Sequence, residues 1–265
     1  MDNPRVTILI ATYNDEEYLD GAIQSAFGQD YDGPLCICVI DDGSTDGSWD
    51  IIGSHFVNSA TAIDQSDRPQ TYSESNLGKS KNVTYIAIRQ SNAGPSDARN
   101  TGIEKTLNNT DVYAVLDADD EMYENKVSTC VNVMKEHMTT IGAVYADYDT
   151  YHTDTEKIIR EFKEPYSRRR LIEECIVHSG AIISKEALLL IKEDTGFYDK
   201  TMRTCEDYDL WMRISEKYII AHVPTSLTLV RVTGDNSSFI VNKGVWEQNW
   251  SRVRKKLHDR TNVQK

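Results

Sequence analysis

The stretch VYAVLDADDE, residues 112–121, decides the fold. It opens with mostly apolar residues, which predict a strand buried on both faces, and it ends in the carboxylates Asp117, Asp119 and Asp120. A buried strand with acids at its carboxyl end places them in the crevice where open α/β sheets bind ligands. Clustered carboxylates repel one another, so we expect a cation among them, and hard oxygen ligands suit Mg²⁺ or Mn²⁺. The alternative is a polar turn whose acids stabilise the N-terminus of a helix expected over 125–138.

The composition of the chain limits the classes of protein to which it can belong. The chain has 265 residues, 39% of them hydrophobic and 27% charged, which is typical of a soluble globular protein with a sizeable core. No run reaches the roughly 18 apolar residues of a membrane span, and no basic and then apolar leader opens the sequence, so we expect a cytoplasmic protein. A net charge of −13 disfavours non-specific binding of the whole molecule to nucleic acid or anionic lipid. The five cysteines lie mostly within apolar runs and predict buried free thiols.

In the first half of the chain, apolar runs that end in polar residues alternate with amphipathic segments. Expected strands cover residues 6–11, 35–40, 84–88, 112–116 and 143–148. Expected helices cover residues 18–27, 45–52, 96–107 and 125–138. The polar residues that follow the first two strands are Thr12, Tyr13, Asn14, Asp41 and Asp42. This alternation predicts a parallel sheet whose strands deliver polar side chains to one edge.

The pattern changes in two places. Residues 53–83 are polar and have few apolar anchors, so we expect a mobile flap or an inserted loop there. Beyond residue 148 the expected elements are strands over 158–162, 180–184, 219–223 and 227–232, and helices over 167–175, 185–191 and from 206.

A terminal helix is expected over 244–258, packed on its own domain or on a second copy. Its basic residues are Arg252, Arg254, Lys255, Lys256, His258 and Arg260. We expect them to form a solvated face, and the alternative is a contact with a polyanion or a peripheral contact with the inner face of a membrane.

Two further helix starts carry charge. In NAGPSDARNTG, residues 92–102, Arg99 and Asn100 fall in the first turn of a helix. The helix dipole disfavours a cation there, so a bound anion would explain Arg99, and the alternative is a side chain that points into water. Glu206 and Asp207 begin another helix, where capping alone accounts for one of the two acids.

Five segments in order resemble a known family. They are TYN at 12–14, DDGSTD at 41–46, NAGPSDARNTG at 92–102, LDADD at 116–120 and EDYDLWMR at 206–213. Together, over about residues 5–232, they resemble the inverting GT-A glycosyltransferases of family 2. The resemblance implies a Rossmann-like α/β domain over 1–240, with a mostly parallel central sheet flanked by helices. Residues 1–148 would form the nucleotide-sugar half, 149–240 an acceptor-side extension, and 241–265 the terminal helix and basic tail.

The resemblance also implies residue roles. It places Thr12, Tyr13, Asn14, Asp41 and Asp42 around the nucleoside of the donor. Arg99 would face the diphosphate or shape the donor pocket, which Asp117 also lines. Asp117 and Asp119 form the D-x-D motif, with Asp119 the direct ligand of Mn²⁺ or Mg²⁺ and Asp120 close behind.

On the acceptor side, Asp207 would be the general base of an E-D pair, with Glu206 its neighbour and an acceptor ligand. His178 and Trp211 are acceptor-side candidates, although Trp211 at helical spacing also suits the core.

The implied activity is metal-dependent inverting transfer of a sugar from a nucleoside-diphosphate sugar, most often UDP-linked, to a hydroxyl of a glycan or lipid-linked saccharide. The absence of a Q-x-x-R-W signature after Trp211 favours a single addition over polymerisation. Nucleic acid and protein remain alternative acceptors. A non-catalytic nucleotide-sugar-binding module is a further alternative. A sugar-1-phosphate nucleotidyltransferase would need a Gly-rich loop with a basic residue, which ILIATYNDEEY at 8–18 lacks.

Overall fold

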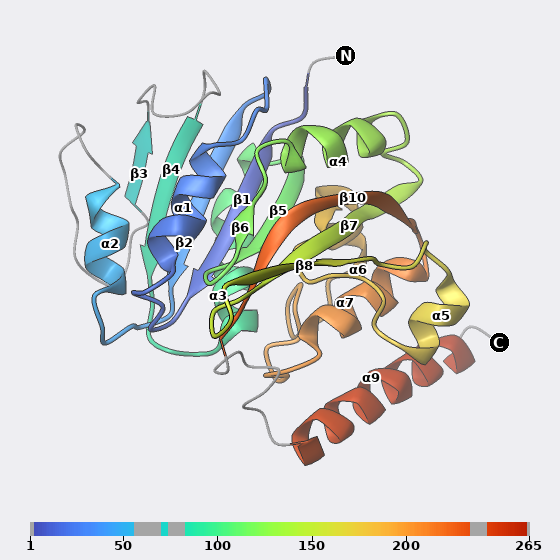
Figure 1. Cartoon of the computed structure of the whole chain (residues 1–265). Coiled ribbons are helices and arrows are strands. Elements are labelled where there is room, and N and C mark those ends of the chain that lie inside the picture. The colour runs from blue at the N-terminus through green and yellow to red at the C-terminus, as the bar shows by residue number, and fades with distance from the viewer. Residues whose placement is uncertain (1–2, 56–69, 74–82, 234–242, 264–265) are drawn as a thin grey trace.

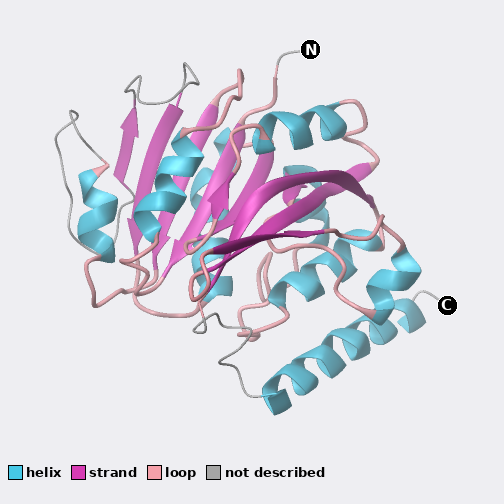
Figure 2. Ribbon diagram, viewed as in Figure 1, coloured by secondary structure: helices cyan, strands magenta, loops and turns pink. Residues whose placement is uncertain are grey.

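The computed structural model describes residues 3–55, 70–73, 83–233 and 243–263. Within these ranges one sheet of ten strands runs through the molecule, and helices cover both of its faces (Figure 1; Figure 2). The predicted α/β fold is confirmed. The prediction of a flap at 53–83 falls largely outside the described residues.

The sheet has the strand order β3-β4-β2-β1-β5-β9-β7-β10-β6, and β8 pairs with β7 beside this path. The strands are β1 Val6–Thr12, β2 Leu35–Asp41, β3 Gln70–Ser73, β4 Val83–Arg89, β5 Val112–Asp117, β6 Glu121–Met122, β7 Ile141–His152, β8 Lys157–Glu161, β9 Ile182–Ser184 and β10 Ile219–Val232. The strands β4, β2, β1 and β5 are parallel, as predicted. Beyond them β9 runs antiparallel to both β5 and β7, so the second half of the sheet is mixed.

The helices are α1 Leu19–Phe27, α2 Ser48–Ser54, α3 Pro95–Thr106, α4 Lys126–Lys135, α5 Arg168–Glu173, α6 Lys185–Ile191, α7 Glu206–Ser215 and α9 Lys243–Val263, with a short 3-10 turn at Leu107–Asn109. None of the described helices combines the length and the apolar character that crossing a bilayer requires. Two elements were not predicted, β3 and the two-residue β6. The strands expected over 219–223 and 227–232 form one strand, β10, whose register against β7 shifts between Val223 and Ser226.

Two hydrophobic cores lie on opposite faces of the sheet. Successive side chains of a strand point to opposite faces, so Ile8 and Ile10 pack in one core and Leu9 in the other. Helices α1 and α4 close the first core, and α3, α6, α7 and α9 close the second. On α3, Gly102 allows close packing, because a Cβ at this position would lie 2.7 Å from Ile40 Cδ1. The parallel strands therefore lie between two packed hydrophobic layers.

Candidate active site

The polar residues that follow the parallel strands meet at one edge of the sheet. In the strand register Thr12 of β1 lies opposite Asp41 of β2, and Ala11 lies opposite Asp117 of β5. Helix α3 begins at the same edge, after β4 (Figure 1). The prediction that these strand ends share an edge is confirmed.

Arg99 joins three elements at this edge. Its guanidinium donates one hydrogen bond to Glu206 Oε1 and one to Asp117 Oδ1, each 2.8 Å long. It also lies 5.5 Å from the ring centre of Tyr198. The Arg99 side chain is 10% exposed, so the alternative of a side chain that points into water is wrong. Two carboxylates offset the cost of burying this cation and tie α3 to β5 and α7.

Asp117 has both carboxylate oxygens engaged. Oδ1 accepts from Arg99, and Oδ2 accepts from the Ser179 hydroxyl at 2.9 Å. Burial alone would raise the pKa of Asp117, but the charge of Arg99 and the bond from Ser179 hold this pKa below its usual value. Asp117 is therefore an ionised residue that the protein itself holds in place.

The other two acids of the D-x-D segment differ in their surroundings. Asp119 is partly exposed, whereas Asp120 is buried and accepts a hydrogen bond from the backbone N–H of Arg231 at 2.9 Å. Burial and the charges of Asp117 and Asp119 raise the pKa of Asp120 well above its usual value. A divalent cation would reverse that shift, so the surroundings of Asp119 and Asp120 fit a hard cation held by oxygen ligands.

Arg231, at the end of β10, holds the D-x-D loop in a way the sequence did not reveal. Besides its bond to Asp120, its Nε donates to the Asp119 carbonyl at 3.1 Å, and its guanidinium forms a 2.7 Å ion pair with Glu121. These contacts link segments about 110 positions apart. The one signal in the sequence was the position of Arg231 near the end of an expected strand.

Glu206 and Asp207 open helix α7. Cys205 immediately before them has φ 60°, a left-handed conformation that is strained for a residue other than glycine. Asp207 is partly exposed, and its Oδ1 accepts from the backbone N–H of Tyr208 at 2.7 Å. Burial, and then the charge of Glu206, raise the pKa of Asp207 to about 7. Since Arg99 engages Glu206, Asp207 is the acid of the pair that is suited to exchange protons near neutral pH.

The residues predicted around the nucleoside mostly bind other residues of the loops in which they lie. The Thr12 hydroxyl donates to Asp15 at 2.8 Å, and Asn14, at φ 59°, accepts from the backbone N–H of Thr45 at 2.8 Å. The first contact lies within the loop after β1, and the second joins this loop to the loop after β2. Tyr13 is 47% exposed, so its ring is open to a ligand.

Asp41 and Asp42 are buried and stabilise neighbouring loops. Asp41 accepts from the backbone N–H of Ser44 at 2.8 Å and lies 3.1 Å from Arg89 Nε. Asp42 accepts from the Gln90 side chain and from two backbone N–H groups of the loop that leads to α3, at 2.7 to 3.0 Å. Their contacts therefore give both acids a structural role in shaping the loops.

His178 precedes Ser179 in the chain. Its ring centre lies 4.5 Å from the ring centre of Tyr148. Burial, and then the positive charges of Lys126 and Lys163, lower the pKa of His178 to about 3, so the ring is neutral at pH 7. Lys163 Nζ lies 5.8 Å from the ring centre of Tyr148. Sequence reasoning overlooked Tyr148 and Lys163, which carry no motif.

Trp211 does not take part in this site. Its side chain is fully buried in the second core, so the assignment of an acceptor-stacking role was wrong. Helical spacing placed it one turn beyond Asp207, but α7 is buried from Tyr208 to Ser215, and Trp211 packs in the second core.

The basic residues of α9 contact the rest of the domain. Arg252 pairs with Asp199, Lys256 with three acids and Arg260 with Glu216, and Arg254 donates to the Glu173 carbonyl. The expectation of a merely solvated face was therefore wrong for Arg252, Lys256 and Arg260, which are partly buried, whereas Arg254 is exposed. They also offer less charge to a membrane surface than the sequence suggested.

Comparison with known proteins gives one family. A sequence profile described as Glycosyl transferase family 2 matches residues 7–190. Chondroitin synthase of Escherichia coli is 24% identical over 263 residues, which cover 99% of this chain and 34% of that protein. Hyaluronan synthase of Pasteurella multocida is 26% identical over 250 residues, which cover 93% and 22%. The chain thus spans about a third of the length of the curated relatives it matches first.

Two solved structures share the fold. Residues 1–349 of S. aureus TarS in complex with UDP-GlcNAc have a TM-score of 0.69 and 15% identity, with 96% of this chain and 66% of that chain covered. The mannosyltransferase PcManGT from Pyrobaculum calidifontis in complex with GDP-Man and Mn²⁺ has a TM-score of 0.60 and 17% identity, with 88% and 59% covered.

Proposed function

This chain belongs to glycosyltransferase family 2, and from that premise we propose that it transfers a sugar from a nucleoside-diphosphate sugar to an acceptor hydroxyl. The observation that carries the proposal is the Arg99 bridge between Asp117, at the end of β5, and Glu206, at the start of α7. The bridge brings the D-x-D segment and the E-D pair into one site. A site that contains both can stabilise a leaving group and accept a proton.

On the donor side we assign the cation to Asp119 and Asp120. Asp119 is partly exposed. For Asp120, burial raises the pKa by more than the nearby charge of Lys126 lowers it. Asp117, by contrast, is already neutralised by Arg99. When bound there, Mn²⁺ or Mg²⁺ would stabilise the charge that develops on the departing nucleoside diphosphate. The fold neighbours solved with UDP-GlcNAc and with GDP-Man and Mn²⁺ support a nucleotide-sugar donor, and UDP is our first choice.

The nucleoside would lie against Tyr13. Its exposed ring offers a stacking surface for a base, while Thr12 and Asn14 hold the loop that carries it. Asp41 and Asp42 would shape the same pocket from behind, because their oxygens already accept bonds from the neighbouring loops.

On the acceptor side Asp207 would take the proton of the attacking hydroxyl. Its pKa of about 7 is close to the operating pH, which is where a general base works best. Attack from the face opposite the leaving group inverts the anomeric centre without a covalent intermediate. Arg99 would hold Glu206 in place, so that Asp207 alone changes its protonation state.

The acceptor would enter beside His178, Tyr148 and Lys163. Among the residues that the structure describes, no carboxylate forms an ion pair with the Lys163 ammonium. The two rings offer a face to a saccharide, and Lys163 offers a charge. We therefore propose a glycan or lipid-linked saccharide as acceptor, with residues 149–240 as the acceptor half and 1–148 as the donor half, whose last residue, Tyr148, borders the acceptor.

The test combines binding and turnover. Wild type, Asp119→Ala and Asp207→Asn are compared with UDP-, GDP- and dTDP-sugars and Mn²⁺, by thermal shift and by release of the nucleoside diphosphate. We expect Asp119→Ala to lose the Mn²⁺-dependent part of the thermal shift, and Asp207→Asn to keep it but to lose about 100-fold or more in turnover. A thermal shift without turnover in wild type would instead indicate a non-catalytic binding module. Turnover by Asp207→Asn at the wild-type rate would remove the assignment of the base.

A further inference from the structure

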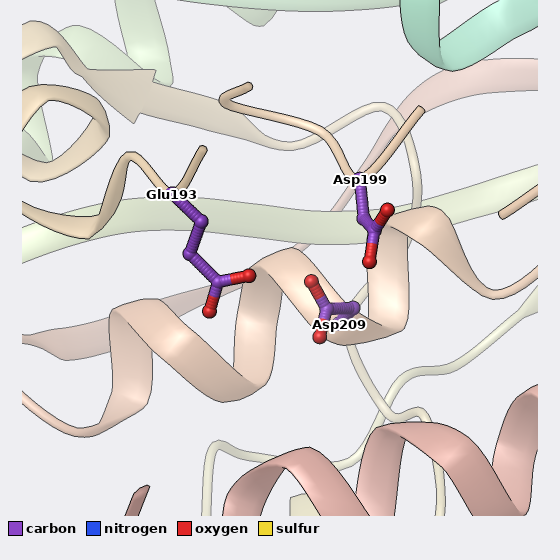
Figure 3. A group of neighbouring side chains, drawn as sticks. All are labelled: Glu193, Asp199 and Asp209. Carbon is purple, nitrogen blue, oxygen red and sulfur yellow. The ribbon is translucent and has the colours of Figure 1, made fainter. Parts of the chain in front are cut away.

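Three acids outside the proposed catalytic centre face one another. Glu193 follows α6, Asp199 lies in the loop before α7, and Asp209 lies in α7 (Figure 3). Each offers a carboxylate oxygen, and these oxygens lie within 4.8 Å of one another, as the ligands of a metal ion would. Asp199 and Asp209 are almost fully buried.

A lysine ammonium from α9 already lies among these acids. Lys256 Nζ is 3.0 Å from Glu193, 2.9 Å from Asp199 and 3.0 Å from Asp209. Lys256 donates a hydrogen bond to Asp199 Oδ2, and its charge lies within ion-pair distance of Glu193 and Asp209. Burial alone would raise the pKa of Asp199, yet bonds from Thr201 and Lys256 lower it to about 2. The triad is therefore a cation site that the chain fills with its own side chain.

Asp199, one of the three acids, is connected to the catalytic centre through its neighbour Tyr198. The side chain of Asn100 binds both the N–H and the carbonyl of Tyr198, each at 2.8 Å, and the Tyr198 ring lies against Arg99. Asp199 is the next residue, so Lys256 holds the far side of the same loop.

Asp209, the second acid, is connected to the catalytic centre through helix α7. Asp209 lies in the first turn of the helix that begins with Glu206 and Asp207. Asp209 also accepts from Arg213 Nε at 2.9 Å, and Arg213 in turn donates to the carbonyls of Ile191 and Phe197. The start of α7 and the loop before it are thus held by one connected set of charges.

We propose that Lys256 is a positioning residue for the transfer reaction, fixing Tyr198 and the start of α7 and thereby the Arg99–Glu206 bridge and Asp207. The inference rests on the proposed function. Without the ammonium each acid keeps an arginine, Arg260 for Glu193, Arg252 for Asp199 and Arg213 for Asp209. The cation that joins all three acids is then lost, and the two segments that carry Asp199 and Asp209 move apart.

The docking of α9 itself has a separate cause. Val253 and Leu257 are buried in the second core, and Trp250 stacks on Tyr208 with the ring centres 6.5 Å apart. Removing the charge of Lys256 therefore leaves the apolar contacts of the helix in place. The exposed neighbour Lys255 offers a matched control, because it lies on the same helix and carries the same charge.

The first experiment measures turnover in Lys256→Met, Lys256→Arg and Lys255→Met. We expect Lys256→Met to lower kcat by about tenfold or more while the donor KM changes by less than about twofold, since the catalytic geometry is disturbed and the donor contacts are not. Lys256→Arg, which keeps the charge, restores most of kcat, and Lys255→Met matches wild type. Methylammonium added to Lys256→Ala restores part of kcat, whereas tetramethylammonium, which has no N–H donor, does not.

The second experiment does not depend on turnover. Cys205 is buried next to Glu206, so its rate of labelling by a thiol reagent, followed by mass spectrometry, reports loosening at the start of α7. We expect labelling of Cys205 to be about tenfold faster in Lys256→Met than in Lys255→Met. This readout remains valid even if wild type transfers no sugar, so a failure of the proposed function can be told apart from a failure of Lys256 to fix the start of α7.

Unchanged kcat and unchanged Cys205 labelling in Lys256→Met, with only a lower unfolding midpoint, would overturn the inference and leave Lys256 a structural contact. If Lys256→Met does not fold, Glu193→Gln serves as the second variant, because it removes one of the three acids and keeps Lys256 paired with the other two. A smaller loss of kcat and a smaller gain in labelling are then expected. Wild-type values for both would again overturn the inference.

Discussion

Replacing Asp207 by asparagine separates stability from activity. In the folded protein, burial and the charge of Glu206 raise the pKa of Asp207 from 3.8 to about 7, so its ionised form is destabilised. Asparagine keeps the shape of the side chain and carries no charge. We therefore expect Asp207→Asn to be inactive and yet more stable than wild type at pH 8.

The magnitude follows from the pKa displacement. At 1.36 kcal/mol per pKa unit, a displacement from 3.8 to about 7 amounts to about 4 kcal/mol. Asp207 is partly exposed and solvent screens its charge, so we expect about 2 kcal/mol in the free energy of unfolding. Between about pH 4 and pH 7 the folded state keeps a proton that the unfolded chain releases, so wild-type stability falls as the pH rises through this window.

The asparagine side chain of the variant does not titrate, so its gain in stability over wild type is absent below about pH 4, grows up to about pH 7 and is constant above it. Besides Glu206, the groups that face Asp207 are Arg99 on α3, Asp117 on β5, Tyr198, Cys175 and Cys205.

The assay is urea unfolding of wild type and variant between about pH 4 and pH 8, with nucleoside-diphosphate release measured on the same samples. Asp154→Asn, an exposed acid in the turn after β7, is the matched control and is expected to show no pH-dependent gain. A gain that is independent of pH, or a variant that is less stable than wild type at pH 8, would refute the assignment of a raised pKa to Asp207.

Two further predictions address the neighbours of Asp207. Arg99→Met leaves Asp117 and Glu206 without their buried cation and is expected to lower the free energy of unfolding by about 3 kcal/mol or more, measured by urea unfolding. Recovery of less than half of this loss in Arg99→Lys would support the two-carboxylate bridge, and full recovery would contradict it. Lys163→Ala is expected to raise the acceptor KM about fivefold, the effect of about 1 kcal/mol, while the donor KM stays unchanged. Equal effects on both KM values would place Lys163 outside the acceptor side.

The parallel half of the fold could be predicted because its signals are local. Apolar runs that end in turn-forming or acidic residues gave β1, β2 and β5, and parallel strands place their carboxyl ends on one edge. The acids at 117 to 120 were expected at that edge for this reason alone. The mixed half was harder to predict, because β9 and β10 pair with strands that are distant from them in sequence. In addition, β6 has only two residues.

The roles of individual side chains were less predictable. Helical spacing placed Trp211 one turn after Asp207 but did not show which face of α7 the core covers. The basic residues of α9 suggested a solvated face, and the acids that neutralise them lie 44 to 67 positions earlier in the chain.

The sequence by itself determined the alternation of strands and helices, the carboxylates at the strand ends and, through the order of its motifs, the family. Only the tertiary structure decided that Arg99 binds Asp117 and Glu206, that Arg231 holds the loop of Asp119 and Asp120, and that Lys256 lies among three acids. The physical reason is the range of the interactions. Periodicity and turn chemistry depend on near neighbours in the chain, whereas the energy of a buried charge depends on residues 18 to 112 positions away that packing alone brings into contact.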